Sequence, residues 1–106
     1  MALQYQASLN KNHGVSATQF LAMLSDNIVE KQVYALRKIS QIVDHQWHEI
    51  SDQLPRIEAL IDEENFPEKQ LAASIASKVF YYLQEHDEAL RLALESGPRF
   101  DIRQQD

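Results

Sequence analysis

The sequence predicts an all-α fold of about five helices that run in antiparallel succession. Apolar residues recur at intervals of three and four along most of the 106-residue chain, which is the period of an α-helix. Only two glycines and three prolines are present, too few for the many tight turns of an all-β protein. A chain of this length forms at most one small domain, with one core and no room for a large ligand cavity.

The composition restricts the classes of partner and of chemistry. Ten Lys and Arg residues oppose sixteen Asp and Glu, and the resulting formal charge of −6 argues against nucleic acid as a partner. The absence of cysteine excludes disulfides, iron–sulfur clusters and thiol catalysis, and it is compatible with a reducing compartment. No apolar run approaches the ~20 residues that span a bilayer, so no membrane partner is expected. These features predict a soluble intracellular protein.

The beginning of the chain is polar and weakly patterned. Residues 1–15 predict a flexible N-terminal arm, because they bury too little apolar surface to offset the entropy lost on ordering. Residues 16–106 are expected to form a helical-hairpin domain. Ser16 and Gln19 have the spacing of a capping box and predict a short helix. Its apolar residues are Phe20, Leu21 and Leu24.

Two further apolar runs follow in the first half of the chain. Asn27 and Glu30 repeat the capping pattern and predict the start of a second helix. Its apolar face comprises Val29, Val33, Leu36, Ile39 and Val43. The next run comprises Trp47, Ile50, Leu54, Ile57 and Ile61. Each run therefore has a helical face of its own.

The apolar pattern does not determine where these two helices begin and end. A tight corner is expected within residues 44–47, because one unbroken helix would leave its face nothing to pack on; a continuous helix is the open alternative. Pro55 falls inside the second run and removes a backbone hydrogen bond. Because the period does not slip at Pro55, one kinked helix is predicted there rather than two separate helices.

Residues 70–97 predict two helices folded back on each other, and the rest of the chain is organised around this hairpin. The alanines of this stretch let two helix backbones approach closely. Pro67 is expected in the first turn of the first helix, Asp87 is expected to cap the second, and Gly97 with Pro98 is expected to end it. The first helix is expected to bury Ala72, Ala76, Val79, Phe80 and Leu83, and the second Ala89, Leu90, Ala93 and Leu94.

Two groups of residues could carry chemistry, and a solvated surface is the favoured interpretation of both. His45 and His48 lie three apart near carboxylates, a donor set that suits zinc or iron, but the His-Glu-x-x-His spacing is absent. An acidic group lacks the glycine and alternating ligands of a calcium loop. It comprises Glu58, Asp62, Glu63, Glu64 and Glu68. No catalytic residue, cofactor site or metal site is therefore predicted, and the protein is expected not to be an enzyme.

Several short motifs resemble the N-terminal segment of the family of the largest non-ATPase subunit of the 26S proteasome regulatory particle. The most specific motif is Ala76-Ser77-Lys78-Val79-Phe80-Tyr81, which is followed by Leu83, Glu88, Leu90, Ala93, Leu94 and Gly97. Ahead of it, Ala35-Leu36, Lys38, Trp47, Glu49-Ile50-Ser51 and Ile57-Glu58 keep the order and spacing of the family. The resemblance extends from about Leu24 to Ile102, roughly three-quarters of the chain.

The resemblance implies a scaffold protein. Members of this family carry an N-terminal α-helical rod of stacked hairpins, followed by a toroid of proteasome/cyclosome repeats. By this resemblance the chain is the N-terminal piece of an α-solenoid, in a subunit of the cytoplasm and nucleus that contacts other base and lid subunits during ubiquitin-dependent degradation. The alternatives are another helical-repeat adaptor and, from a different class, a small helical-bundle metal-binding protein that uses His45 and His48.

The predicted roles of individual residues follow from these patterns. The structural core is expected to contain Leu36, Trp47, Ile50, Ile57, Ala76, Val79, Phe80 and Leu83. Adjacent Tyr81 and Tyr82 cannot both face one side of a helix, so at least one is expected at the surface. The candidate interface comprises Tyr81, Tyr82, Leu90, Leu94, Phe100 and Ile102. The chain is also expected to self-associate through the part of this surface around Leu90, Leu94, Phe100 and Ile102.

Overall fold

A computed structural model of the chain describes residues 16–97, and this part is entirely α-helices and connecting turns without a strand. The all-α prediction with five helices is therefore confirmed. The predicted arm at 1–15, together with Pro98, Phe100 and Ile102, lies outside the described residues. The helices are α3 (Ala17–Met23), α4 (Val29–Ser51), α5 (Leu54–Asp62), α6 (Lys69–Tyr82) and α7 (His86–Ser96).

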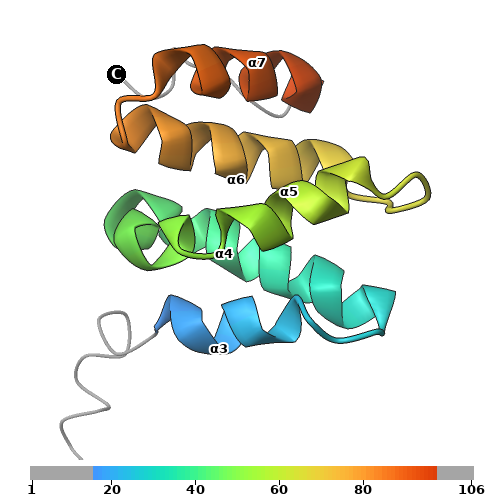
Figure 1. Cartoon of the computed structure of the whole chain (residues 1–106). Coiled ribbons are helices and arrows are strands. Elements are labelled where there is room, and N and C mark those ends of the chain that lie inside the picture. The colour runs from blue at the N-terminus through green and yellow to red at the C-terminus, as the bar shows by residue number, and fades with distance from the viewer. Residues whose placement is uncertain (1–15, 98–106) are drawn as a thin grey trace, which may run out of the picture.

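The helices are stacked in layers, with α3 at one end and α7 at the other (Figure 1). Helix α6 lies in the middle of this stack and packs against α4, α5 and α7, while α3 packs against α4. A turn of three residues joins α6 to α7, which is short enough to hold the two helices as an antiparallel hairpin. The predicted hairpin thus forms one side of the molecule.

The start of α3 is fastened to α4. The Ser16 hydroxyl caps the helix by accepting a 3.0 Å hydrogen bond from the Thr18 amide. The Ala17 amide, which has no partner within α3, donates to the Gln46 side-chain oxygen at 2.9 Å and to a Glu49 carboxylate oxygen at 3.0 Å. Ser16 is therefore the N-cap of α3, as predicted. Side chains from α4 accept the hydrogen bonds of the Ala17 amide.

The predicted cap of α4 was wrong. Ile28 occupies the N-cap position and offers no side-chain cap bond, whereas Asn27 was expected there. Asp26 instead accepts a 2.9 Å hydrogen bond from the Ile28 amide, and this bond lowers the pKa of the Asp26 carboxyl. The side chains of Asp and Asn can both accept a hydrogen bond from the backbone amide two residues later in the chain. In this turn Asp26 makes that bond, and its neighbour Asn27 does not occupy the N-cap.

Helix α4 contains the corner predicted within residues 44–47. Gln46 has the non-helical dihedral angles φ −127° and ψ 28°, so α4 consists of two helical parts that meet at a kink. The side chain of Gln46 stabilises this geometry, because it reaches across to the Ala17 amide of α3. The open alternative of one unbroken helix is excluded.

Both proline predictions were wrong in detail. Helix α4 ends at Ser51 and α5 begins at Leu54, so two helices separated by a turn replace the single kinked helix predicted through Pro55. Pro55 lies in the first turn of α5, where its missing N–H would have had no intrahelical partner. Pro67 precedes α6, which begins only at Lys69.

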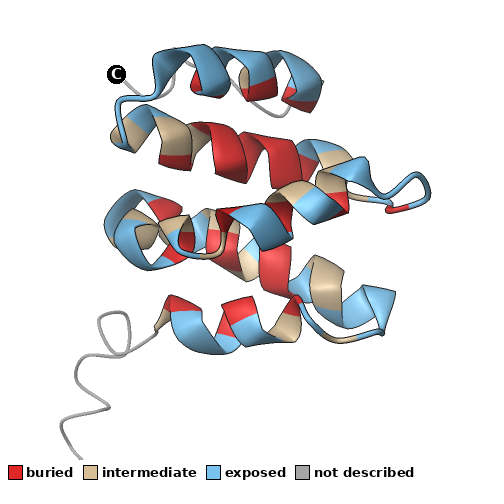
Figure 2. Cartoon of the chain, in the orientation of Figure 1, coloured by how far each residue is buried: buried red, intermediate tan, exposed pale blue. Residues whose placement is uncertain are grey.

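The core follows the inner faces of the stack and includes most of α6 (Figure 2). Residues 71–77 of α6 are all buried, because other helices cover this helix on both sides. Of the predicted core, five residues are buried: Leu36, Ile50, Ile57, Ala76 and Val79. Trp47 and Phe80 are partly buried and pack against the core. Leu83 is 40% exposed, so its placement in the core was wrong; α6 ends before it, and Leu83 lies in the turn.

Helix α7 differs from its prediction in orientation and in its cap. Leu90 and Leu94, expected to be buried, face outward, whereas Ala89 is buried as predicted. Glu85 is the N-cap and makes no side-chain cap bond, so the predicted cap by Asp87 was also wrong. The helix ends as predicted at Gly97, whose φ of +60° favours glycine and where a Cβ would lie 3.1 Å from the Gln70 side chain.

Candidate interaction surface

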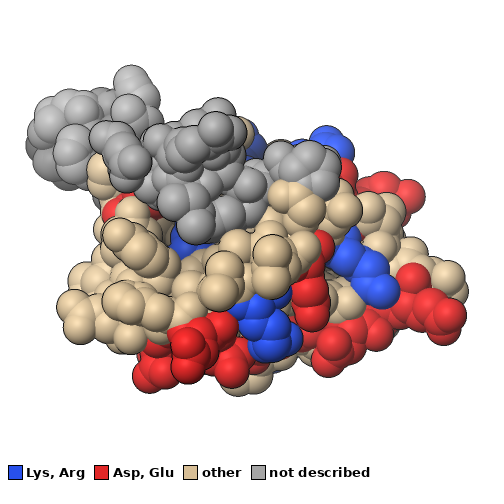
Figure 3. Space-filling model, turned by 90° about the horizontal axis from the view of Figure 1, so that it is seen from above, with Lys and Arg blue, Asp and Glu red and all other residues tan. Residues whose placement is uncertain are grey.

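The outer face of α7 carries an exposed apolar pair. Leu90 is 56% exposed and Leu94 is 75% exposed, and their spacing of four residues places them side by side along the helix. The opposite face contains Leu92, which is 2% exposed, and fully buried Ser96. Figure 3 looks onto the α7 side and shows uncharged surface interrupted by basic and a few acidic side chains, with most acidic side chains along one edge. Two leucines therefore remain uncovered at one end of the stack.

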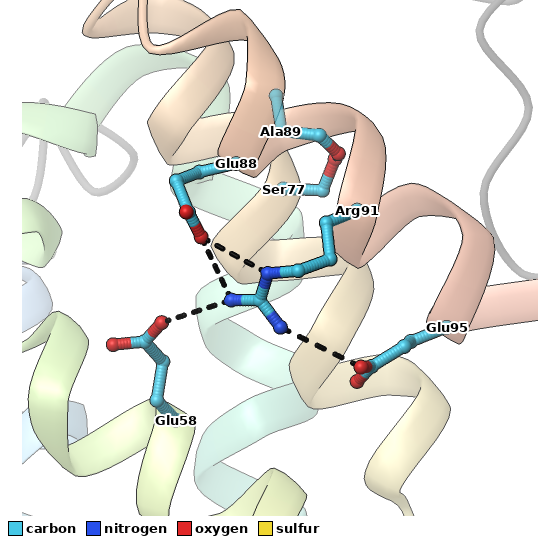
Figure 4. A network of polar contacts seen from close by, with 6 residues as sticks. All are labelled: Glu58, Ser77, Glu88, Ala89, Arg91 and Glu95. Atoms are coloured by element: carbon cyan, nitrogen blue, oxygen red, sulfur yellow. Dashed lines mark hydrogen bonds and ion pairs between the residues drawn. The ribbon is translucent and has the colours of Figure 1, made fainter.

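The inner face of α7 is held close to α6 by small side chains and one hydrogen bond. The Ser77 hydroxyl of α6 donates a 2.5 Å hydrogen bond to the carbonyl oxygen of Ala89 in α7 (Figure 4). Ser77 is only 1% exposed, and the neighbouring Ala73 and Ala76 of α6 are buried. Small residues permit close backbone approach, and a buried hydroxyl needs such a partner. These contacts hold α7 against α6, so that its outer face, with Leu90 and Leu94, points away from α6.

An ion-pair network borders the leucine pair and connects α7 to α5 (Figure 4). The Arg91 guanidinium donates to Glu88 through Nη2 at 2.8 Å and through Nε at 3.1 Å. It also pairs with Glu95 at 3.5 Å and with Glu58 of α5 at 3.7 Å. The hydrogen bond to Glu88 raises the pKa of Arg91 further. Three carboxylates around one cation leave this border with excess negative charge.

The two adjacent tyrosines have different environments. The Tyr82 hydroxyl donates a 2.8 Å hydrogen bond to Asp44, and its ring stacks on Trp47 with centroids 5.4 Å apart. This bond to a carboxylate, with burial, raises the pKa of Tyr82 to about 12. Tyr81 is 56% exposed, with its ring centroid 6.0 Å from that of His86. Tyr81 is therefore the tyrosine that faces outward, while Tyr82 joins α6 to α4.

The residues considered for metal chemistry lie mainly at the surface. The His48 ring stacks on Trp47 with centroids 3.8 Å apart, and His45 and His48 border an open groove. In the acidic group, Glu58 pairs with Arg91 and Glu68 pairs with Arg37, while the other three carboxylates are exposed at the end of α5 and just after it. Among residues 16–97, no three His, Cys, Asp or Glu side chains are grouped to hold a metal ion. None of the described helices is long and apolar enough to cross a membrane.

The sequence reasoning missed residues that orient the hairpin. Ser77 and Arg91 supply the cross-helix contacts, and Leu92 supplies the buried leucine of α7. A signal for Leu92 was present, because steps of three and four from Ala89 lead to Leu92 and Ser96. The i,i+3 and i,i+4 spacing of Glu88, Arg91 and Glu95 was also a signal for their pairing within α7. No comparable signal marks the bond of Ser77 to Ala89 or the pair of Arg91 with Glu58, because those partners lie on other helices.

A stack of short antiparallel helices with one end uncovered is typical of the α-solenoid class, in which each hairpin covers the apolar face of its neighbour. Residues 15–106 match the family model described as the N-terminal domain of 26S proteasome subunit RPN2. The chain belongs to this family.

Curated relatives include proteins of fungi, an insect and a plant. The chain is 49% identical over 85 residues to the 26S proteasome regulatory subunit rpn2 of Schizosaccharomyces pombe, covering 80% of this chain and 9% of the relative. It is 46% identical over 87 residues to 26S proteasome regulatory subunit RPN2 of Saccharomyces cerevisiae, covering 82% and 9%. It is 41% identical over 87 residues to 26S proteasome non-ATPase regulatory subunit 1 of Drosophila melanogaster, covering 82% and 8%. The chain thus spans less than a tenth of the length of these relatives.

Proposed function

We propose that this chain is a non-catalytic structural part of the base of the 26S proteasome regulatory particle. It would form the first layers of a helical rod that serves ubiquitin-dependent degradation in the cytoplasm and nucleus. Family membership supports the assignment to a proteasome regulatory subunit. The observation that carries the structural role is the exposed pair Leu90 and Leu94 on a hairpin braced from within by Ser77.

The proposed mechanism is stacking of a further hairpin on α7. Burial of a leucine side chain contributes about 1.5–3 kcal/mol, so covering Leu90 and Leu94 would stabilise the next layer considerably. The Arg91 network borders this face with excess carboxylates, which favours Lys or Arg along the matching edge of the covering hairpin. The relatives supply ample further chain for such a layer, because the matched part is a small fraction of their length.

The proposed partners are other base and lid subunits of the regulatory particle. Tyr81 is a candidate contact, because its ring is exposed at the end of α6 and offers both an apolar face and a hydroxyl. The net charge of −6 disfavours a nucleic-acid partner. The chain would contribute shape and contacts to the particle, and the chemistry would belong to other subunits.

Co-purification tests this function directly. The chain, extended by its natural continuation through further hairpins, is expected to recover named base and lid subunits from cell extract. The double substitution Leu90→Ser with Leu94→Ser is expected to reduce this recovery. The matched control is Ile28→Ser with Val29→Ser, an exposed apolar pair at the start of α4 that should leave recovery unchanged. A well-folded extended chain that recovers no proteasome subunit would overturn the proposal.

The exposed pair also predicts self-association of the 106-residue chain on its own. A second copy is the available cover for Leu90 and Leu94 when no further hairpin follows. Sedimentation is expected to give a concentration-dependent dimer, which the Leu90→Ser, Leu94→Ser variant abolishes. A strict monomer at high concentration would contradict this expectation.

A further inference from the structure

A groove of about 1050 Å³ runs along α3 and α4, on the opposite side of the stack from α7. Phe20 of α3 forms its apolar floor and is 9% exposed, and Ile42 of α4 lies beside it, half-buried. The Tyr34 ring stands edge-on to Phe20 with centroids 6.3 Å apart and is 49% exposed. A half-exposed tyrosine therefore stands beside a largely buried apolar floor along α4.

The described lining of this groove includes one lysine, two histidines and one glutamate. The Lys38 ammonium lies 5.6 Å from the Tyr34 ring centroid, and His45 and His48 line the same groove. Among the described residues, ion pairs involve Lys31, Arg37, Lys78 and Arg91, so Lys38 belongs to none of them.

One carboxylate also borders the groove, and it is already engaged. Glu49 accepts hydrogen bonds from the Ala17 amide at 3.0 Å and from the Ser16 hydroxyl at 3.4 Å. Its negative charge is thus directed at the start of α3. In a chain whose formal charge is −6, the Lys38 cation at this groove favours an acidic ligand.

We propose that the groove between α3 and α4 binds an acidic segment of a neighbouring proteasome subunit. The segment would place an aliphatic or aromatic side chain against Phe20 and Ile42, and a carboxylate at the Lys38 ammonium. Charge complementarity disfavours residues 1–15 of the chain itself as the occupant, because that stretch contains Lys11 and His13 and no Asp or Glu. This inference rests on the proposed function, which supplies the neighbouring subunit.

Site-specific photo-crosslinking in the assembled regulatory particle tests the inference. A photoreactive phenylalanine derivative replaces Gln41, which is exposed and borders the groove. The matched control places the same residue at Glu64, which is exposed in the turn between α5 and α6. Position 41 is expected to crosslink to a peptide of another subunit that carries at least one Asp or Glu, as identified by mass spectrometry, and position 64 is not expected to give this product.

A charge reversal makes the test specific for the chemistry. Lys38→Glu in the position-41 background is expected to lower the crosslink yield about tenfold, because attraction becomes repulsion in a partly enclosed site. Lys69→Glu, a lysine at the start of α6 outside the groove, is expected to leave the yield unchanged.

The remaining outcomes each decide a different point. An assembled particle in which position 41 crosslinks to residues 1–15, to a peptide without Asp or Glu, or to nothing would overturn the groove proposal alone. An undiminished yield in Lys38→Glu would also overturn it. A well-folded chain that never enters the particle would overturn the proposed function and, with it, the identity of this partner.

Discussion

The Ser77 hydroxyl donates a 2.5 Å hydrogen bond to the carbonyl oxygen of Ala89 and so joins α6 to α7 within the buried interior of the hairpin. The other buried serines behave differently. Ser74 donates to Leu71 and Ser96 donates to Ala93, each within its own helix. Because Ser77 alone among these three bonds across helices, its bond helps to fix the rotation of α7, and this rotation decides which leucines face outward.

Ser77→Ala is expected to destabilise the folded chain by about 1 kcal/mol, the usual net contribution of a neutral hydrogen bond. Ser74→Ala is the matched control, because its hydroxyl serves only its own helix, and it should cost less. Urea denaturation followed by circular dichroism gives both values. Equal losses in the two variants would show that the bond to Ala89 contributes nothing beyond a local serine effect.

The three leucines of α7 form a matched set for a second prediction. Leu92→Ala should cost about 2–4 kcal/mol, because it removes a fully buried side chain and leaves a cavity. Leu90→Ala and Leu94→Ala should each lie within about 0.5 kcal/mol of the unmodified chain, because both side chains face solvent. These free energies should be measured at protein concentrations low enough to keep the chain monomeric. A loss at Leu90 as large as that at Leu92 would contradict the orientation of α7.

This orientation marks a limit of prediction from the sequence. The helical period predicts the hairpin and its limits, because Gly97 and the polar turn before α7 interrupt the apolar pattern. It does not determine the rotation of α7, because Leu90, Leu92 and Leu94 alternate with a spacing of two. Packing against the small residues of α6 and the bond from Ser77 decide it, and both are tertiary effects.

Local signals were similarly incomplete for the ends of helices. Ser16 caps α3 as its residue type predicts, but Asp26 rather than its neighbour Asn27 bonds the backbone before α4. The period across Pro55 concealed a break, because a two-residue turn there preserves the positions of the apolar residues. The helical class and the number of helices were therefore predictable. The helix boundaries were not, because several residues near each end could make the capping hydrogen bond and the sequence does not show which one does.

The candidate surface was predictable only as a set of alternatives. The helical geometry requires that Tyr81 and Tyr82 point in different directions, but it does not say which one is exposed. The deciding contact is the hydrogen bond from Tyr82 to Asp44, which lies 38 residues earlier in the chain. The sequence alone gives no means of pairing these two positions.

The Tyr82–Asp44 bond predicts a specific dependence of stability on pH. The folded chain raises the pKa of Tyr82 from 10.0 to about 12, so the phenol holds its proton more tightly when folded than when unfolded. Its contribution to stability is complete below pH 10 and is lost as the pH rises through about 12. Tyr82→Phe should therefore cost about 1 kcal/mol at neutral pH and cost progressively less in alkaline solution.

The difference between the two proteins isolates this titration. Unfolding free energies of the unmodified chain and of Tyr82→Phe, measured at matched pH values, cancel most of the contribution from Lys78, which also lies near Asp44 at 3.9 Å. Tyr81→Phe is the control, because it removes a neighbouring phenol that does not bond Asp44. Its effect on the unfolding free energy should not decrease between pH 10 and about 12. A difference that stayed constant up to the alkaline limit would contradict a raised pKa at Tyr82.

The Arg91 network predicts a dependence on salt rather than a large stability. Its ion pairs are about half exposed, so they contribute only about 0.5–1 kcal/mol together, and this is lost as the screening length falls from about 10 Å in 0.1 M salt to about 3 Å in 1 M salt. Arg91→Gln removes the cation and leaves Glu58, Glu88 and Glu95 to repel one another. Added salt should therefore destabilise the unmodified chain slightly and stabilise the variant, so that the two unfolding free energies converge. A loss in Arg91→Gln that persisted unchanged in high salt would mean that the arginine acts through packing of its aliphatic stem, and not through its charge.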